Sequence, residues 1–473
     1  MTSVYVHLNW GATPVYDRVV EDLMDNGHIQ SVGATVTGRK YYQYLKEESN
    51  VQYDPLYCVQ DIHNNITKKD VDPSRINELE QKYGRPFLWP ALLADRVYYE
   101  YDLIEQKRML QGWFDFYINI FEEFDPDLFF TTDVDSAYTW IPFRIAETSG
   151  IGATYKHTRI KDRASVIRNP YDRFEDIYST FHKLNHSQNF DDYTQSKKEA
   201  ESYVNQFRSQ NGINPSYLDQ QSWRDNLYTI GKEAVNYTYN YYFGYYKNDF
   251  YFSDTPLEQV KNQIGYYVKK HKTNNSYLFS KPNYDEPYVV FTEHLQPEAT
   301  LLTLAPLYNN QQDPLRDLSR SMPVNWKVYF KVHPKMIGKR SLSYYEQISQ
   351  MPNVELIHPS ENTQELIQNC KMVVTITGTS GLEAILYQKP AMTFGEPSYL
   401  ELSMAYKIQN KENLSNQIKY VMDTHKHDDQ ELINYITAVF HNTTTYPHSA
   451  EVDNNDVINI ISKQIKEQAL NFV

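Results

Sequence analysis

The first half of the chain alternates short apolar runs with longer amphipathic stretches. The run at 2–8 is β-branched and aromatic, which predicts a buried strand. Residues 101–124 carry apolar side chains at helical spacing and stop at Asp125 and Pro126. Strands that alternate with helices in this way are typical of an α/β fold. The predicted strands are 2–8, 127–132 and 152–155, and the predicted helices are 15–25, 101–124 and a stretch that ends near 150.

The second half shows the same alternation more clearly. Its apolar runs are nearly continuous, which is typical of a parallel sheet that helices cover on both faces. Asn362 or Thr363 is expected to cap a short helix. Two such halves predict a bilobal α/β architecture with a ligand cleft between its lobes. The predicted strands are 288–294, 326–334, 354–359, 372–377 and 390–395; helices are predicted after the first strand to about 320, at 363–370, at 378–387 and throughout the chain after 395.

The region between the two halves is mostly helical and rich in tyrosine. The tyrosines of 236–252 recur at helical spacing, which favours packing between helices over stacking on sugars. The polar stretch 273–287 contains two prolines and marks a domain boundary. The predicted domains are an N-terminal Rossmann-like lobe at 1–175, a helical Tyr-rich insert or connector at 176–284, a C-terminal Rossmann-like lobe at 285–410 and C-terminal helices at 411–473.

Composition limits the classes of function that the chain can have. The 473 residues include 46 Lys or Arg and 60 Asp or Glu, so the formal net charge is −14. This acidic balance argues against general nucleic-acid binding but allows a local basic cleft for a phosphorylated ligand. The only cysteines, Cys58 and Cys370, exclude a disulfide framework and a cysteine-based zinc site. With no signal peptide and no apolar run of membrane length, the sequence predicts a cytoplasmic protein and leaves peripheral membrane contact open.

Residues 378–384, Gly-Thr-Ser-Gly-Leu-Glu-Ala, leave a predicted strand and open a helix. Gly378 and Gly381 allow close approach of the backbone, and Thr379 and Ser380 add hydroxyl donors, which suits a phosphate group. Glu383 falls on the first helical turns, where it could accept from ribose hydroxyls or balance the helix dipole. An ordinary capped turn between a strand and a helix is the alternative interpretation.

His333 lies at the carboxyl end of another predicted strand, within Lys331-Val332-His333-Pro334-Lys335. Ligands of doubly wound sheets bind at this edge. The imidazole could donate to a phosphate oxygen, while Lys331 and Lys335 could add positive charge. The alternative is a structural histidine in the turn before Pro334.

Two further polar groups follow predicted strands. Glu293, Gln296 and Glu298 lie where the strand at 288–294 meets a helix, so that some of them could face the cleft and others could cap the helix. Asp133 and Asp135 follow the strand at 127–132. A carboxylate there could act as a general base or nucleophile, or the pair could hold Mn²⁺ or Mg²⁺. Asp135 or Ser136 could instead cap the next helix.

The order of these motifs resembles the capsular polysaccharide biosynthesis family of GT-B glycosyltransferases, which includes the bacterial capsule Kdo transferases. The resemblance covers about 285–400 and depends on Gln-Pro-Glu, His-Pro and Gly-Thr-Ser-Gly-x-Glu-Ala in that order. It implies a GT-B-like fold of two Rossmann-like lobes with a central cleft and a helical insert. The residue roles that it implies are His333, Thr379 and Ser380 against the donor phosphate, Glu383 near the ribose, and Gln296 and Glu298 beside the donor sugar.

The sequence therefore predicts a glycosyltransferase that moves a sugar, in one interpretation a CMP-activated acidic sugar, from a nucleotide donor to a surface or capsular polysaccharide. The acceptor could be lipid-linked, and no nucleic acid, cofactor or metal is expected to take part. The predicted catalytic residues are Asp133, Asp135 and His333. Three alternatives stay open: a UDP-sugar 2-epimerase on the same fold, a metal-dependent transferase built on the two aspartates, and a non-catalytic glycan-binding component of a capsule assembly or export complex.

Overall fold

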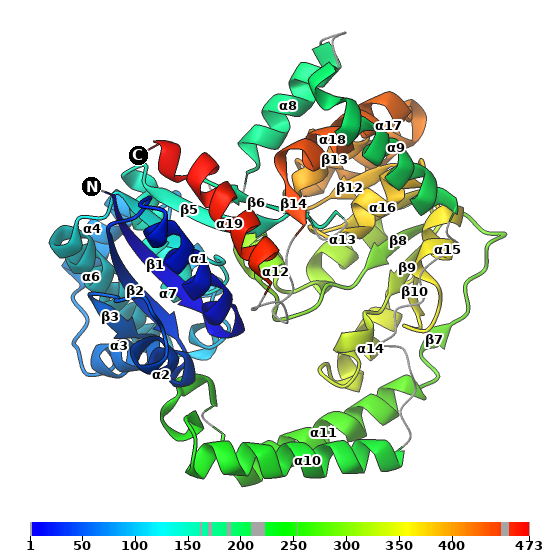
Figure 1. Cartoon of the computed structure of the whole chain (residues 1–473). Coiled ribbons are helices and arrows are strands. Elements are labelled where there is room, and N and C mark those ends of the chain that lie inside the picture. Colours follow the sequence, from blue (N-terminus) through cyan, green and yellow to red (C-terminus); the bar gives the residue numbers. More distant parts are fainter. Residues whose placement is uncertain are drawn as a thin grey trace. The chain divides into compact units, whose positions relative to one another are not determined.

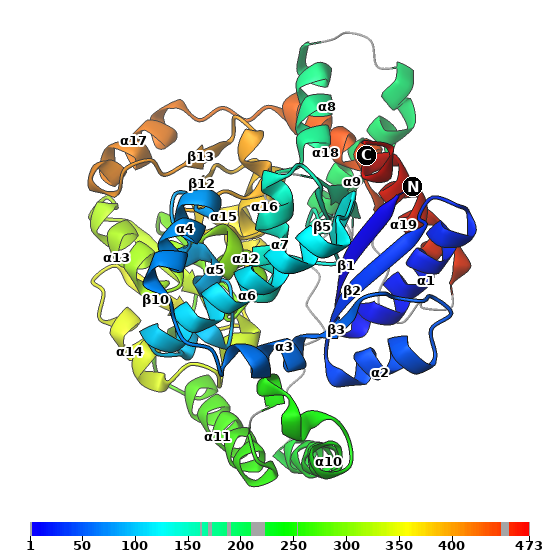
Figure 2. The same ribbon diagram turned by 90° about the vertical axis from the view of Figure 1, so that its left-hand side faces the viewer.

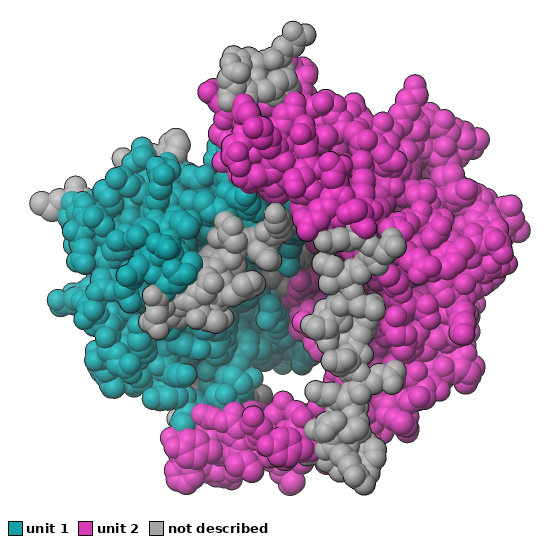
Figure 3. All heavy atoms as spheres, turned by 45° about the vertical axis from the view of Figure 1, so that its right-hand side comes forward, with its two compact units in different colours: residues 1–176, 244–253, 442–473 teal, residues 177–243, 254–441 magenta. Residues whose placement is uncertain are grey.

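The computed structural model describes residues 2–160, 163–168, 173–186, 191–209, 223–252, 254–445 and 454–472. The chain forms two compact units, each assembled from separate stretches of sequence (Figure 3). Unit 1 consists of residues 1–176, 244–253 and 442–473, and unit 2 consists of residues 177–243 and 254–441. Each unit is built around one sheet (Figure 1).

Unit 1 contains a seven-stranded sheet. Its strands are β1 (Ser3–Asn9), β2 (Ser31–Thr37), β3 (Leu56–Cys58), β4 (Leu128–Thr131), β5 (Gly152–His157), β6 (Arg163–Ile167) and β14 (Thr444–Thr445). They lie in the order β14-β6-β5-β4-β1-β2-β3. Strands β1 to β5 are parallel, β6 is antiparallel to β5, and β14 is antiparallel to β6. The strand order therefore reverses between β1 and β4, as in a doubly wound sheet.

Alternate residues of the unit 1 strands enter two separate cores, because successive side chains of a strand point to opposite faces. Val4 and Val6 join one core, and Tyr5 joins the other. The final helix α19, far from α1 in sequence, contributes Ile461 to the same core as Val4. The helices on this side are α1 (Thr13–Asp25), α2 (Arg39–Glu47) and α19 (Asn455–Gln468), and those of the other core are α3 (Val59–Ile66), α4 (Pro73–Tyr83), α5 (Trp89–Leu93), α6 (Leu103–Phe124) and α7 (Ala137–Thr148) (Figure 2).

A short segment between two helices of unit 2 is part of unit 1. In this segment, residues 244–253, the buried carboxyl of Asp249 accepts a 3.0 Å hydrogen bond from Gln60. The Phe250 ring stacks on His63 at 4.1 Å between ring centroids. The hydroxyl of Tyr251 donates to that of Tyr138 at 2.6 Å. These contacts anchor the segment among residues that lie far from it in sequence.

Unit 2 contains a second seven-stranded sheet, in which all strands are parallel. Its strands are β7 (Phe279–Ser280), β8 (Tyr288–Thr292), β9 (Lys327–Lys331), β10 (Val354–Ile357), β11 (Met372–Thr375), β12 (Ala391–Thr393) and β13 (Ala405–Lys407). They lie in the order β13-β12-β11-β8-β9-β10-β7. Without β7 this is the 3-2-1-4-5-6 order of the Rossmann fold, with its reversal between β8 and β11.

The helices of unit 2 cover its sheet and extend beyond it. Val289, Phe330 and Val374 are fully buried in a core that is completed by Leu315 and Leu318 from a covering helix. The helices are α8 (Glu175–His186), α9 (Thr194–Ser209), α10 (Trp223–Tyr242), α11 (Pro256–Asn274), α12 (Ala299–Leu304), α13 (Gln312–Ser321), α14 (Leu342–Ser349), α15 (Thr363–Asn369), α16 (Ser380–Leu386), α17 (Leu414–Thr424) and α18 (Asp429–Asn442).

The α/β class with two Rossmann-like lobes is confirmed, and the prediction that the chain after 395 is helical is wrong. Two short strands, β13 and β14, lie in that region and pair with the sheets of unit 2 and unit 1. The sequence pattern also missed β2, whose residues Ser-Val-Gly-Ala-Thr-Val-Thr include few large apolar side chains. The four predicted domains and the three boundaries between them stay predictions. Among the described residues, no helix is both long and apolar enough to cross a membrane.

Candidate functional site

The reversal of strand order in unit 2 brings three of the predicted motifs to one edge of the sheet. β8 lies between β9 and β11, and all three strands point the same way. Adjacent strands are about 4.8 Å apart, so the residues that follow these strands are neighbours. Glu293, His333 and Gly378 come from these three strand ends. This edge is the place where doubly wound sheets bind their ligands.

The Gly378 turn is tied to the ends of β8 and β11 by hydrogen bonds to side chains. The hydroxyls of Thr292 and Ser380 lie 2.8 Å apart, and the Gly378 N–H donates to the Thr375 hydroxyl at 3.1 Å. A Cβ at Gly378 would lie 2.6 Å from that hydroxyl oxygen, so no side chain fits there. Thr379 is exposed at the start of α16. The turn therefore presents a close-packed backbone and hydroxyl groups.

His333 is held in one tautomer. Its Nδ1 accepts the backbone N–H of Lys335 at 3.1 Å, which leaves the proton on Nε2. Burial, followed by the charges of Lys335, Lys331 and Lys339, lowers the pKa of His333 to about 4. The half-buried imidazole is therefore neutral at physiological pH, with an Nε2–H group that can donate a hydrogen bond.

Glu293 lies beneath His333 and is almost fully buried, with 3% of its surface exposed. Its carboxyl accepts the His333 backbone N–H at 3.0 Å and faces the Tyr345 hydroxyl at 3.4 Å. Burial raises the pKa of Glu293 to about 8. Glu293 therefore supports the backbone of His333, which differs from the predicted direct contact with a donor.

The two lysines near His333 differ in their surroundings. Lys331 is buried, and its ammonium donates to the carbonyl oxygens of His358 and Pro359 at 3.0 and 2.8 Å. Burial lowers the pKa of Lys331 to about 7. Lys335 is exposed. Lys335 is thus better placed than Lys331 to bring positive charge to a bound anion.

Gln296 and Glu298 follow β8 and precede α12. Gln296 donates to the Asn309 carbonyl at 2.8 Å, and its side-chain oxygen accepts from Gln311 and Arg340. Glu298 occupies the position before α12. Gln296 is therefore held by protein partners on both sides of its amide.

Gly381 and Glu383 lie on α16. A Cβ at Gly381 would meet the Tyr399 hydroxyl at 2.1 Å, so this glycine is required by packing against Tyr399. Glu383 is half-buried, and desolvation raises its pKa to about 7. A carboxyl group in this state can both donate and accept hydrogen bonds near neutral pH.

The two predicted aspartates of unit 1 follow β4, where the strand order of that sheet reverses. The carboxylate of Asp133 accepts a 2.8 Å hydrogen bond from the backbone N–H of the next residue, Val134. Asp133 is open to solvent. The protein atoms crowded around it, together with the charge of Asp135, raise the pKa of Asp133 to about 7. A carboxylate with such a pKa is suited to general-base chemistry.

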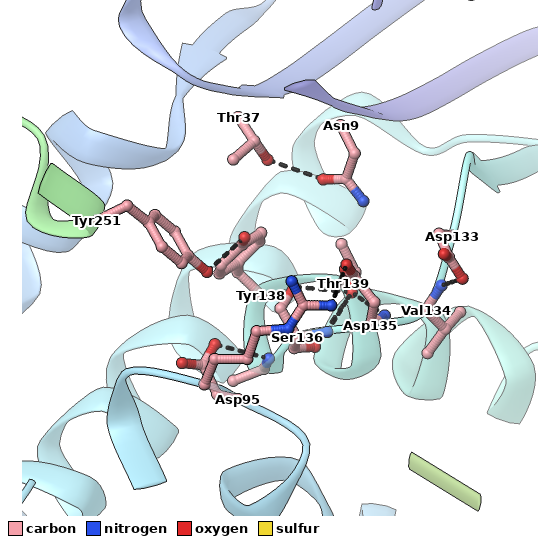
Figure 4. A network of polar contacts seen from close by, with 12 residues as sticks. Asn9, Thr37, Asp95, Asp133, Val134, Asp135, Ser136, Tyr138, Thr139 and Tyr251 are labelled. Carbon is pink, nitrogen blue, oxygen red and sulfur yellow. Dashed lines mark hydrogen bonds and ion pairs between the residues drawn. The ribbon is translucent and has the colours of Figure 1, made fainter. Parts of the chain in front are cut away.

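Asp135 is held by neighbouring residues (Figure 4). Its carboxylate pairs with Arg96 at 3.6 Å, and its backbone N–H donates to the Thr139 hydroxyl at 3.0 Å. Ser136, not Asp135, is the capping residue of α7 and forms a capping box with Thr139. Asp133 is therefore the less constrained of the two predicted acids.

The structure adds site residues that sequence reasoning did not select. Thr292 is a polar residue that ends an apolar strand, a signal that was available in the sequence. His294 bridges β8 and β11 by accepting from Ile376 N–H at 3.2 Å and lying 3.0 Å from the Thr375 hydroxyl. Across the described ranges, no three side chains of His, Cys, Asp or Glu gather so as to hold a metal ion.

Comparison with sequences of known proteins gives one family and one pair of relatives. A family model described as "Capsule polysaccharide biosynthesis protein" matches residues 191–439, just over half of the chain. The capsule polysaccharide modification protein LipA from Neisseria meningitidis serogroup B is 35% identical over 72 residues, which are 15% of this chain. The LipA of serogroup A matches equally, and the matched stretch spans 10% of each relative.

Matches among solved structures include two transferases and an epimerase. The β-Kdo 2,7 transferase of Thermosulfurimonas dismutans KpsC is 11% identical and has a TM-score of 0.31 over 71% of this chain and 87% of its own. The β-Kdo 2,4 transferase of the same protein is 16% identical, with a TM-score of 0.24 over 42% and 59%. The UDP-GlcNAc 2-epimerase of Neisseria meningitidis is 11% identical, with a TM-score of 0.27 over 97% and 100%.

Proposed function

Since the chain belongs to the capsule polysaccharide biosynthesis protein family, we propose that it is a glycosyltransferase that moves a sugar from a nucleotide donor to a capsular or surface polysaccharide. The observation that carries this proposal is the edge of the unit 2 sheet where β8, β9 and β11 end. There a neutral histidine follows β9 and a hydroxyl-bearing turn follows β11, the two parallel strands that flank β8. The family match covers this region of the chain.

In the proposed reaction, unit 2 binds the leaving phosphate of the donor. The Nε2–H of His333 donates to a phosphate oxygen. The Thr292 and Ser380 hydroxyls carry two hydrogens, of which their mutual bond uses one, so the other can donate to the phosphate. Lys335 adds positive charge beside His333. Donors fixed before the bond breaks stabilise the charge that develops on the phosphate.

In the same proposal, Asp133 is the general base. Asp133 takes the proton of the acceptor hydroxyl while its oxygen forms the new bond to the anomeric carbon. The bond between that carbon and the phosphate oxygen breaks, and the electron pair leaves with the nucleotide. The raised pKa of Asp133, about 7, gives the carboxylate enough basicity to accept the proton and leaves it largely ionised above neutral pH.

The finer assignments are also part of the proposal, and they rest on the resemblance of the His-Pro element and the hydroxyl-containing turn to enzymes that use CMP-activated acidic sugars. The donor is a CMP-activated acidic sugar, and the acceptor is the end of a growing, lipid-linked glycan at the inner face of the membrane. Glu383 lies on α16 beyond Ser380 and would contact the ribose. Stabilisation of the phosphate by hydrogen-bond donors and Lys335 needs no metal ion or organic cofactor.

The test compares two histidines that lie in similar sequence contexts. His333 and His358 both follow a strand and precede a proline, but both ring nitrogens of His358 face protein partners, Ser360 and Asn274. We expect His333→Ala to lower nucleotide release from a CMP-sugar by orders of magnitude and to reduce thermal stabilisation by CMP. His358→Ala should keep both. Normal turnover of His333→Ala would contradict the phosphate role, and turnover without acceptor that converts the sugar would indicate an epimerase.

A further inference from the structure

A buried amide at the edge of the unit 1 sheet has no partner for its nitrogen. Asn9 ends β1, which lies beside β4 where the strand order reverses. Only 9% of the residue is exposed, and its Nδ2 makes no hydrogen bond. Its backbone N–H donates to the Thr132 hydroxyl at 3.3 Å, so Asn9 is joined to the loop that leads to Asp133. A buried donor without an acceptor is costly, and native structures rarely leave one unused.

The orientation of this amide is set by a chain of buried hydrogen bonds. Thr37 donates its single hydroxyl hydrogen to Asn9 Oδ1 at 2.8 Å. Thr37 can then only accept from His7, whose Nε2 is 3.1 Å away, and His7 Nδ1 accepts from the Tyr117 hydroxyl at 2.8 Å. Burial lowers the pKa of His7 to about 3, so His7 stays neutral. The chain has one direction and fixes Oδ1 against Thr37.

The amide nitrogen consequently points away from Thr37. Figure 4 shows it turned toward the side of the network on which Asp133 and Asp135 lie. Asp135 is engaged by Arg96, whereas Asp133 is open to solvent. A donor with no acceptor thus faces the same side as an accessible carboxylate.

We propose that Asn9 and Asp133 together bind one hydroxyl group of the acceptor sugar, with Asn9 Nδ2 donating to its oxygen and Asp133 accepting its hydrogen. A hydroxyl is the group that can accept one hydrogen bond and donate another at the same atom. This inference rests on the proposed function and adds a substrate-binding residue to it. In the transfer, the hydroxyl proton passes to Asp133, and the Asn9 amide keeps its bond to the oxygen as the oxygen joins the donor sugar.

The test measures sugar binding to the full chain without any donor. Saturation-transfer NMR is recorded with methyl glycosides of glucose, galactose, N-acetylglucosamine, glucuronic acid and Kdo. We expect the wild-type chain to give signals from at least one of them. Asn9→Asp keeps an oxygen for Thr37 and removes the donor, so the signal should fall by about five-fold, the effect of one lost hydrogen bond. Asn64→Asp, on the exposed surface of α3, is the matched control and should keep the signal.

Two further variants keep the outcome clear. His333→Ala should keep the glycoside signal, because the glycosides have no phosphate, so failure of the donor site and failure of this inference give different results. If circular dichroism shows that Asn9→Asp is unfolded, Thr37→Val is used in its place. This variant removes the hydroxyl that orients the Asn9 amide, and it should reduce the signal by about three-fold. No signal from any glycoside with the wild type, or an undiminished signal in the folded Asn9 or Thr37 variant, would overturn the inference.

Discussion

The hydroxyls of Thr292 and Ser380 lie 2.8 Å apart and connect the end of β8 to the start of α16. This bond crosses the position where the strand order of unit 2 reverses. It has two possible roles, since it could hold the turn in place or present a hydroxyl hydrogen to a ligand. The two roles can be separated by changing each partner alone.

We predict that Ser380→Ala lowers CMP affinity by about ten-fold, because it removes the hydroxyl nearest the turn. Thr292→Val removes the same internal bond but leaves the Ser380 hydroxyl in place, so its effect should stay within about three-fold. Isothermal titration of both variants with CMP measures the difference. Equal losses in the two variants would show that the bond is structural.

The pH dependence of transfer should report the ionisation of Asp133. A base acts only when it is deprotonated, so kcat/KM should fall about ten-fold per pH unit below 7, the value near which the surrounding protein atoms and Asp135 place the pKa of Asp133. Asp135→Asn removes a charge that raises this pKa and should move the midpoint to lower pH. Lys156→Met removes a charge that lowers it and should move the midpoint upward, with Arg159 still present. A pH profile that neither variant shifts would exclude Asp133 as the base.

Replacing two glycines by alanine should change stability in opposite directions, because one glycine is closely packed and the other is not. A Cβ at Gly378 would lie 2.6 Å from the Thr375 hydroxyl, so Gly378→Ala should lower the free energy of unfolding by about 2 kcal/mol through overpacking. Gly231 lies inside α10 with nothing within 4 Å of a Cβ, so Gly231→Ala should raise stability by about 0.5–1 kcal/mol. Chemical denaturation of the two variants measures both effects. A stable Gly378→Ala would mean that the turn can move away from Thr375.

Buried histidines should make the protein sensitive to acid. Burial lowers the pKa of His63 to about 4, below its unfolded value near 6.5, so the unfolded chain binds the proton more tightly. The free energy of unfolding is therefore highest above pH 6.5 and decreases as the pH falls toward 4. The decrease is about 2 kcal/mol at pH 5. His63→Gln should therefore reduce the slope of stability against pH between 6.5 and 5. Parallel pH slopes for the variant and the wild type would contradict the burial effect.

The parallel strands were the most predictable part of the fold. Runs such as 288–292 and 372–375 are buried on both faces and therefore almost purely apolar, which makes them visible without structural information. β2 escaped prediction because its glycine, alanine and threonines are small or polar. Gly33 has a packing reason to be glycine, since a Cβ there would lie 2.7 Å from the Tyr5 ring.

The candidate site was predictable in its positions more than in its roles. The rule that ligands bind where parallel strands end selected His333, Ser380 and Asp133 correctly as residues of those edges. It could not tell that Lys331 turns its ammonium to two backbone carbonyls, or that Glu293 supports the His333 backbone. Such roles depend on contacts between loops distant in sequence. The orphan nitrogen of Asn9 depends on three partners that no local pattern links.

The segment 244–253 has a consequence for anyone who wishes to study the two units apart. The chain passes from one unit to the other four times, near 176, 243, 253 and 441. Expressing 1–176 by itself would omit α19, which fills the core beside β1, and the anchor at Asp249 and Tyr251. Dissection by simple truncation therefore exposes apolar surface in either half. Isolated units would have to be made by rejoining distant pieces of the gene product with new linkers.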